Sequence, residues 1–365
     1  MSRARGCRWS FLAALGALVA LTVLAALPRR AGAAEQVRVL ISEGKSGVTV
    51  ASAGGLTLTD ATGRRILLQR AAPSPVRVLA QRQAVLVPEV GATLPVVLAW
   101  PGRLPTVSLD GQAYRGRLEL RRLNGGLATV NVVEMEDYLQ GVLKDEIPPG
   151  WPAEAAKAMA VAARTYAAFR MRENPGALFH VRATTASQVY GGATGEDART
   201  SWAVQATAGQ ILTFAQQPFP AFYHSCSGGT TEDALDVFGL EFDMVVGVAD
   251  DYSRGCPHAL WIARLSAADI ERALARAGYP ARGLRKIEPL LRSRGGRVLR
   301  LAVSHGGGRS MLEGKRFREA IGYDVVRSTD FEVRSDAGGF TFVGRGSGHG
   351  VGLSQWGAKE MADLA

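Results

Sequence analysis

The sequence lacks the features of a nucleic-acid-binding protein, even though its net charge is +10 at pH 7. The arginines are scattered, and no basic tract is interleaved with aromatic residues. After residue 27 the chain has no apolar run long enough to span a membrane, and it has no internal repeat. We therefore predict no nucleic-acid partner, and the positive charge suits an anionic cell wall or membrane surface instead.

The N-terminus is typical of a secretory signal. Residues 1–10 hold three arginines and no acidic residue, residues 11–27 are apolar, and Ala31-Gly32-Ala33 suits signal peptidase. The apolar run is slightly short for a spanning helix, which favours cleavage over an uncleaved signal-anchor. Cys7 precedes this run, which argues against a lipid-modified cysteine. We predict a signal peptide over residues 1–34 and export to the periplasm or cell wall.

The rest of the chain has the composition of a folded protein, with 47% apolar and 21% charged residues. Short apolar or alternating runs separated by glycines and prolines predict a β-rich N-terminal subdomain over residues 35–110. The Asn124-Gly125 turn between two apolar runs then predicts a hairpin over residues 114–133. Residues 111–365 are predicted to be the functional core.

A pair of helices is expected within this core. Residues 137–145 place apolar side chains at helical spacing, and Pro148 and Pro149 must end that helix. A second helix begins at Pro152 and stops after residue 173, and a third is predicted over 266–277. The sequence therefore predicts an α+β fold, with the helix pair packed on β structure.

Glu146 lies between the two paired helices, where prolines restrict the backbone. Its apolar neighbours Leu143, Ile147 and Trp151 would desolvate the carboxyl and raise its pKa, as a general acid requires. The alternative is a solvated glutamate at a helix end, and the adjacent Asp145 shows that acidic residues are common here. Local chemistry alone leaves both interpretations open.

Residues 344–358 (GRGSGHGVGLSQWGA) form the most unusual stretch of the chain. Alternating glycines allow close approach of the backbone to a ligand, but their order does not match a phosphate-binding loop. Polar and aromatic side chains between the glycines favour a ligand-facing role, and a Gly-rich turn around a buried histidine is the alternative. The candidate ligand-contacting residues are Arg345, His349, Ser354, Gln355 and Trp356.

His224 and Cys226 mirror Cys256 and His258 in spacing, and the four side chains would complete a tetrahedral structural zinc site. A Cys226–Cys256 disulfide is favoured over this zinc site, which stays the alternative, because an even pair of cysteines outside the cytoplasm is usually bridged. A zinc-dependent hydrolase is disfavoured, since four protein ligands leave no position for water. His180 and His305 have no evident partner and are interpreted as structural.

Five distinctive blocks follow one another along the chain: YLQGVLKDEIPPGWPAEAAKAMAVAARTYA (138–167), SQVYGG (187–192), a run from ATAGQILTF to YHSCSGGTTE (206–232), CPHALW (256–261) and GRGSGHGVGLSQWGA (344–358). Together they cover most of residues 110–360 and resemble the family of stage II sporulation protein D and the LytB amidase enhancer. The resemblance implies a peptidoglycan-binding protein of sporulation or envelope remodelling, with members that are lytic transglycosylases on glycan strands lacking stem peptides.

The resemblance places the catalytic glutamate at Glu146. One carboxyl suffices for this reaction, because it protonates the glycosidic oxygen and then accepts a proton from the muramic acid 6-hydroxyl, which closes a 1,6-anhydro ring. No cofactor is required. The implied substrate groove is lined by the 344–357 loop and by four further residues, which alone would be read as helix surface or strand core: Arg164, Tyr166, Gln188 and Tyr190.

Some positions depart from the family pattern. Ser347 stands where relatives often have an aromatic residue, Met159 replaces a usual glutamine and Ala156 a usual leucine. The chain stops at Ala365, so we expect the core to lack a final helix that relatives have, at a cost in stability or activity. The competing hypothesis is a non-catalytic protein that binds the wall and stimulates an N-acetylmuramoyl-L-alanine amidase.

Overall fold

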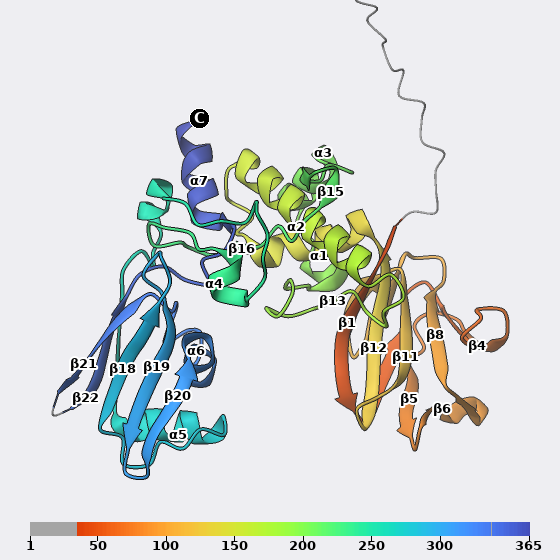
Figure 1. Cartoon of the computed structure of the whole chain (residues 1–365). Helices are drawn as coiled ribbons and strands as arrows, with labels where there is room; N and C mark the ends of the chain where they lie inside the picture. Colours follow the sequence, from red (N-terminus) through yellow and green to blue (C-terminus); the bar gives the residue numbers. More distant parts are fainter. Residues whose placement is uncertain (1–34, 337) are drawn as a thin grey trace, which may run out of the picture. The chain divides into compact units, whose positions relative to one another are not determined.

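The N-terminal part of the chain builds two sheets (Figure 1). The structure is a computed structural model that describes residues 35–336 and 338–365, so the predicted signal peptide lies outside the described residues. The seven-stranded sheet has the order β13 (Val181–Arg182), β1 (Gln36–Lys45), β12 (Gly126–Glu134), β11 (Arg117–Leu123), β8 (Val96–Pro101), β3 (Leu56–Thr59) and β4 (Ile66–Arg70). The six-stranded sheet has the order β10 (Gln112–Arg115), β9 (Thr106–Leu109), β2 (Gly47–Ala51), β5 (Val76–Gln81), β6 (Ala84–Val87) and β7 (Ala92–Leu94).

Strand β12 (residues 126–134) has the apolar run of a central strand. Its residues 126–133 are all buried, because both faces of the strand are covered. Leu127 and Val133 face the main core, whereas Val130 and Val132 pack in a second cluster with partly buried Phe179. Such burial on both faces produces a continuous apolar run rather than a strict alternation.

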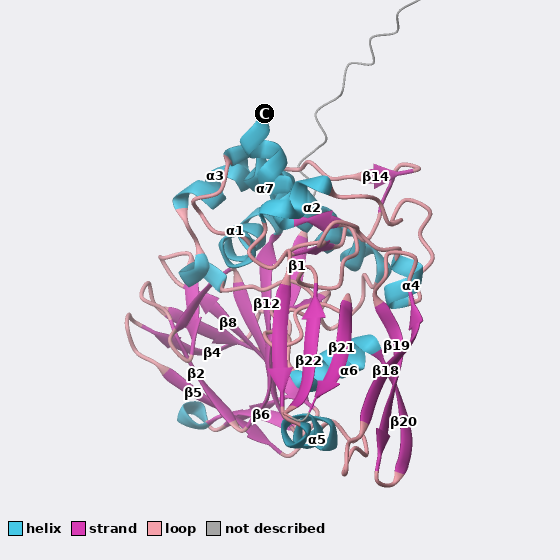
Figure 2. Cartoon of the chain, turned by 90° about the vertical axis from the view of Figure 1, so that its left-hand side faces the viewer, coloured by secondary structure: helices cyan, strands magenta, loops and turns pink. Residues whose placement is uncertain are grey.

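The predicted helix pair is confirmed. Helix α1 spans Met135–Glu146 and α2 spans Ala153–Glu173, with Pro152 preceding the first turn of α2. In α1, Tyr138, Leu139, Val142 and Leu143 are buried, so one face of the helix packs on the sheets. Helix α3 (Ala198–Ala206) and helix α7 (Gln355–Leu364), which we did not predict, pack beside this pair (Figure 2).

A second core lies in the C-terminal part of the chain. Two three-stranded sheets have the orders β17 (Trp261–Leu265), β22 (Gly339–Gly344), β21 (Phe331–Asp336) and β18 (Lys286–Arg292), β19 (Val298–His305), β20 (Gly308–Glu313). Helices α5 (Ala267–Arg276) and α6 (Gly314–Ile321) share their core, in which Phe317, Phe331 and Phe342 form a buried aromatic cluster. Helix α5 agrees with the helix predicted over 266–277, and Ser266 caps it by accepting a hydrogen bond from the backbone N–H of Asp269.

The remaining elements are short. They are helix α4 (Ala234–Phe238), the 3₁₀ turns η1 (Pro88–Val90), η2 (Gly192–Gly195) and η3 (Asp251–Gly255), and the strand pairs β14 (Thr213–Phe214) with β15 (Gln217–Pro218) and β16 (Tyr223–His224) with β23 (Leu353–Ser354). The mixture of seven helices and several sheets in the described residues confirms the α+β class. No described helix is both long and apolar enough to cross a membrane. The predicted division at residue 110 stays a prediction, and the seven-stranded sheet holds strands from both sides of it.

Candidate functional site

Glu146 is the last residue of α1, and a backbone donor holds its carboxyl. The helix ends here because Ile147 adopts an extended backbone, with φ −138° and ψ 147°, just before Pro148. The Oε1 atom of Glu146 accepts a hydrogen bond of 2.8 Å from the backbone N–H of Val189. The SQVYGG segment therefore reaches Glu146 through a main-chain group.

Gln355, the first residue of α7, lies against the same glutamate. Its Nε2 donates to the backbone oxygen of Glu146 at 3.1 Å and lies 3.5 Å from the carboxyl Oε2. The neighbouring Ser354 caps α7, because its hydroxyl accepts a hydrogen bond of 3.2 Å from the backbone N–H of Gly357. Gln355 thus belongs to the Glu146 site, whereas buried Ser354 has a capping role instead of the predicted substrate contact.

A chain of buried hydrogen bonds leads to Glu146. Tyr138 Oη donates to Gln188 Oε1 at 2.9 Å. Gln188 Nε2 donates to the Ala163 carbonyl at 3.2 Å and to Tyr223 Oη at 3.1 Å. Because the Ala163 carbonyl can only accept, it fixes the orientation of the Gln188 amide. Tyr223 then accepts from Gln188, and its own proton is available for the hydrogen bond that joins it to Glu146.

Burial raises the pKa of Glu146 above its usual value. Hydrogen bonds from the Val189 N–H, the Tyr223 hydroxyl and the Gln355 amide offset part of this effect, because they favour the carboxylate. Burial also raises the pKa of Tyr223 well above its usual value, so this residue stays a neutral donor. A withdrawn carboxyl held by neutral donors can carry a proton and release it, as general acid–base catalysis requires.

Pairing of two short strands brings Tyr223 and Gln355 to the site. Strand β16 runs parallel to β23, with Tyr223 opposite Leu353. The Leu353 N–H donates to the Phe222 carbonyl at 2.9 Å, and the Trp356 N–H donates to the Ser225 carbonyl at 3.0 Å. These bonds fix the segment around Tyr223 to the start of α7, so the two side chains meet Glu146 together.

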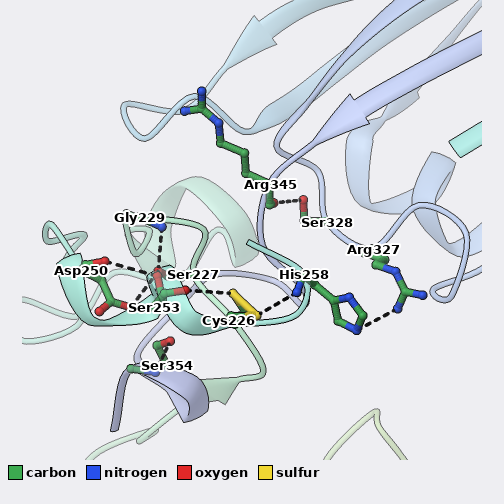
Figure 3. The surroundings of a disulfide bond; sticks show 12 residues. Cys226, Ser227, Gly229, Asp250, Ser253, His258, Arg327, Ser328, Arg345 and Ser354 are labelled. Atoms are coloured by element: carbon green, nitrogen blue, oxygen red, sulfur yellow. Dashed lines mark hydrogen bonds between the residues drawn. A yellow bond between two sulfur atoms is a disulfide. The ribbon is translucent and has the colours of Figure 1, made fainter. Parts of the chain in front are cut away.

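A disulfide between Cys226 and Cys256 follows directly after β16 (Figure 3). Cys226 also forms a two-way backbone bridge with Ser347, at 2.9 and 2.8 Å. The cross-link therefore fastens the Gly-rich segment and η3 to the strand that carries Tyr223. Such a covalent link restricts the unfolded chain more than it changes local chemistry.

Of the two alternatives for these cysteines, the structure forms the favoured disulfide and not the zinc site, because the two sulfurs are bonded to each other and are not thiolates. The two histidines have other partners: His224 Nδ1 lies 3.1 Å from the Val351 oxygen, and His258 Nε2 lies 3.2 Å from Arg327 Nη1 (Figure 3). Among the described residues no cluster of three or more His, Cys, Asp or Glu side chains is arranged to hold a metal ion.

The Gly-rich segment approaches the protein's own backbone rather than leaving room for a ligand, which corrects our interpretation of its glycines. Gly352 has φ +75°, and a Cβ there would clash with the Phe222 carbonyl. The ring of His349 packs beside Phe222, Phe238 and His224, and burial lowers its pKa to about 3. His349 therefore stays neutral and supports the loop, in place of the predicted contact with substrate.

Arg164 and Tyr190 are also packing residues, not the predicted groove residues. Arg164 is 2% exposed and forms two hydrogen bonds with the Glu136 carboxylate, at 2.7 and 3.0 Å. Its remaining N–H groups bond to carbonyls of α3 and the following loop. Tyr190 is buried, and its hydroxyl donates to Asn131 Oδ1 at 2.7 Å. Gln188 is likewise buried and acts through Tyr223.

Partly exposed aromatic side chains lie close in sequence to residues of the Glu146 site. Trp356, directly after Gln355, contacts Trp151 with ring centroids 5.1 Å apart at 66°. Tyr166 is half-buried and packs against Phe222, and Arg345 is exposed. Trp356 is therefore a predicted contact residue whose ring stays partly exposed, and Trp151, interpreted from the sequence only as an apolar neighbour of Glu146, packs against it.

Tyr223 was missed as a functional residue at the level of sequence. It is the first residue of the YHSCSGG run, so a signal was present, but the histidine and cysteine that follow it have the more familiar ligand chemistry. The Val189 N–H was also missed, because a main-chain donor has no side-chain signature. Both became visible only through the hydrogen bonds of Glu146.

Comparison with known proteins adds an independent view. The stage II sporulation protein family matches residues 123–214, which include Glu146 and Val189, and residues 257–352 match a domain of unknown function, DUF8618. An uncharacterized protein of Brachyspira hyodysenteriae is 31% identical over 70% of this chain and 69% of its own length. Stage II sporulation protein D of Bacillus amyloliquefaciens is 31% identical over 64% of this chain and 70% of its own. The amidase enhancer of Bacillus subtilis is 27% identical over 70% of this chain and 42% of its own.

Proposed function

The chain belongs to the family of stage II sporulation protein D and the LytB amidase enhancer, and from this premise we propose that it binds and cleaves peptidoglycan glycan strands. The proposed reaction is lytic transglycosylation of strands that lack stem peptides, outside the cytoplasm after export by residues 1–34. A role in the cell wall follows from the family, whereas the reaction and the location are our proposals.

One observation carries the proposed reaction: a single withdrawn carboxyl, Glu146, is held by neutral donors and has a raised pKa. In the first step the protonated Glu146 gives its proton to the glycosidic oxygen while the bond from that oxygen to muramic acid C1 breaks. In the second step the 6-hydroxyl of the same sugar bonds to C1 and its proton passes to Glu146. The glutamate returns to its starting state, and no water is consumed.

The neighbours of Glu146 fit both steps. After the first step the carboxyl is charged, and the hydrogen bonds from Tyr223, Val189 and Gln355 stabilise that charge. Trp151 and Trp356 offer apolar ring surface on which a sugar can stack. The protein therefore needs only to position the glycan and exchange one proton.

Mass spectrometry of products from stem-peptide-free glycan strands tests this function. We expect fragments with 1,6-anhydro-muramic acid ends from the wild type and none from Glu146→Gln, with binding to the strands retained. Glu154→Gln, at an exposed glutamate on α2, is the matched control and should cleave like the wild type. Intact glycan with folded, bound wild-type protein would overturn the proposed reaction.

A second candidate function rests on the similarity to an amidase enhancer. In this alternative the protein binds the wall and stimulates an N-acetylmuramoyl-L-alanine amidase without cleaving glycan itself. Stimulation that persists in Glu146→Gln, measured as stem peptides released by a cell-wall amidase, would support it. The raised pKa of Glu146 has no role in this alternative, which is why we place transglycosylation first.

A further inference from the structure

The positive charge of the folded chain is concentrated in the C-terminal part. Residues 257–352, which match the domain of unknown function, contain 17 arginines or lysines and nine acidic residues, a net charge of +8. Residues 35–256 contain 20 basic and 22 acidic residues, a net charge of −2. The catalytic candidate Glu146 therefore lies in a part of the chain with almost no net charge, and the basic part follows it.

One face of the sheet β17–β22–β21 gathers part of this charge. Arg264 of β17 and Arg334 of β21 both pair in register with Thr341 of β22, so the three side chains point to the same side. The arginine Cα atoms are two strand spacings, or about 10 Å, apart. Ile262 and Val343 form the adjacent row on this side.

This face is open, because the opposite face packs on the core. Trp261, Phe340 and Phe342 are buried on the core side. On the open side Ile262 is 61% exposed and Val343 is 37% exposed. The one acidic residue in these rows, Glu332, has its charge balanced by Arg292 at 2.8 Å. Arg264 and Arg334 form no ion pair with any described residue.

The open face is continuous with the Glu146 site along the chain. Strand β22 leads into the Gly-rich segment, where exposed Arg345 continues the alternation of Thr341 and Val343. The side chain of Arg345 extends away from the disulfide (Figure 3). The same segment ends at Gln355, which contacts Glu146.

We propose that the open face of β17–β22–β21, through Arg264, Arg334 and Arg345, binds the free lactyl carboxylates of glycan strands from which stem peptides have been removed. Removing the peptide leaves one carboxylate on each muramic acid, so a stripped strand is a polyanion with apolar sugar faces. Guanidinium groups bind carboxylates directly, and the row of Ile262 and Val343 offers apolar surface between them. This inference rests on the proposed function and assigns the preference for stripped strands to residues 257–352.

Binding measurements with two forms of one polymer test the proposal. Stripped glycan strands are compared with the same strands after carbodiimide coupling of their carboxylates to methylamine, which removes the charge. The variant is Arg264→Glu with Arg334→Glu, and the control is Arg64→Glu with Arg65→Glu, an exposed pair in the turn before β4. Arg264→Lys with Arg334→Lys keeps the charge, and circular dichroism checks that each variant is folded.

We expect the wild type to bind the carboxylate form more tightly than the neutral form, with a preference that weakens at high salt. Charge reversal should weaken binding to the carboxylate form about tenfold and leave the neutral form unchanged, whereas the lysine variant should lose less. The control pair should bind like the wild type. Equal binding of both glycan forms by the wild type would overturn the proposal.

Two further outcomes distinguish carboxylate binding from membrane binding and from glycan cleavage. If charge reversal abolishes binding to phosphatidylglycerol vesicles but not to stripped glycan, the face is a membrane surface and the proposal is wrong. If the wild type binds stripped glycan in the expected manner but yields no anhydro products, the proposed reaction fails while this binding assignment stands.

Discussion

Burial raises the pKa of two glutamates near the Gly-rich segment, the half-buried Glu146 and the buried Glu232. Their partners differ. Glu146 receives hydrogen bonds from a main-chain N–H, a phenol and an amide, all neutral. Glu232 is 2% exposed and lies 3.5 Å from the guanidinium of Arg297, which is itself 1% exposed. One carboxyl sits among neutral donors, and the other sits beside a fixed positive charge.

The Glu232–Arg297 pair joins loops. Arg297 donates to the carbonyls of Ser227 at 2.9 Å and Gly348 at 3.2 Å, and the backbone N–H of Glu232 donates to Gly350 at 2.9 Å. The guanidinium of Arg297 favours the charged form of Glu232 and offsets part of the effect of burial on its pKa, whereas no cation lies among the groups that shift the pKa of Glu146. The comparison indicates that neutral surroundings, not burial alone, distinguish a proton carrier from a structural ion pair.

Replacing each carboxyl with an amide tests the difference between the two glutamates most directly. Glu146→Gln should lower the rate of glycan cleavage by about 10³-fold, because the general acid is lost. Glu232→Gln should change the rate per folded molecule little, although it weakens the fold. Rates are measured from anhydro-ended products at equal concentrations of folded protein. An equal loss of rate in both variants would mean that Glu146 has no catalytic role beyond that of Glu232.

Removing Arg297 tests whether the Glu232–Arg297 pair stabilises the fold. Arg297→Met should lower the free energy of unfolding by about 3–5 kcal/mol, because it leaves Glu232 buried beside no cation. Urea denaturation measures the change, and Arg300→Met, at an exposed arginine on strand β19, which begins directly after Arg297, is the control. A change as small as that of the control would show that the pair does not hold the loops.

Removing one neutral donor tests how the hydrogen bonds to Glu146 set its pKa and the rate of cleavage. Tyr223→Phe deletes a hydrogen bond that favours the carboxylate, so the pKa of Glu146 should rise further. Cleavage needs the protonated acid at the start, so the fall in rate at high pH should move to higher pH, and the maximal rate should drop about tenfold. The pH profile of kcat/KM measures both effects. Tyr252→Phe, at an exposed tyrosine of η3, should move neither.

The smallest effect concerns stability and pH. A raised pKa means that folded Glu146 holds its proton more tightly than the unfolded chain does. Its contribution to stability is therefore full below the unfolded pKa and is lost as the pH rises through the folded pKa. Glu146→Gln removes this loss, so its Tm relative to the wild type should be higher at pH 7 than at pH 4. A constant difference in Tm across this range would contradict the raised pKa.

The elements with strong local signals were predictable from the sequence. Prolines 148, 149 and 152 mark the gap between α1 and α2, so the helix pair and the location of Glu146 followed from local chemistry and from the family resemblance. The chain's third predicted helix, α5, has a serine cap and a clear apolar stripe. Helix α7 was missed because its first residues belong to the Gly-rich motif, whose glycines hide the helical pattern.

The errors in the site have a common physical cause. Arg164 and His349 carry polar groups, and such groups were assigned to substrate because the sequence does not show which carbonyls or rings surround them. Tyr223 was missed for the opposite reason, since a tyrosine in an apolar run looks like core until its hydroxyl is seen beside Glu146. Local pattern predicts which residues are near each other in sequence, but hydrogen-bond partners across long separations depend on tertiary contacts.

The contact between Gln355 and Glu146 spans 209 residues of chain. During synthesis, Glu146 emerges long before the strand β23 that must pair with β16 to bring Gln355 and Tyr223 into place. A partly synthesised chain therefore carries the acidic residue without the groups that hold it in position. For a protein proposed to cut the wall that surrounds its own cell, this order delays the assembly of the cutting site until Gln355 has been made.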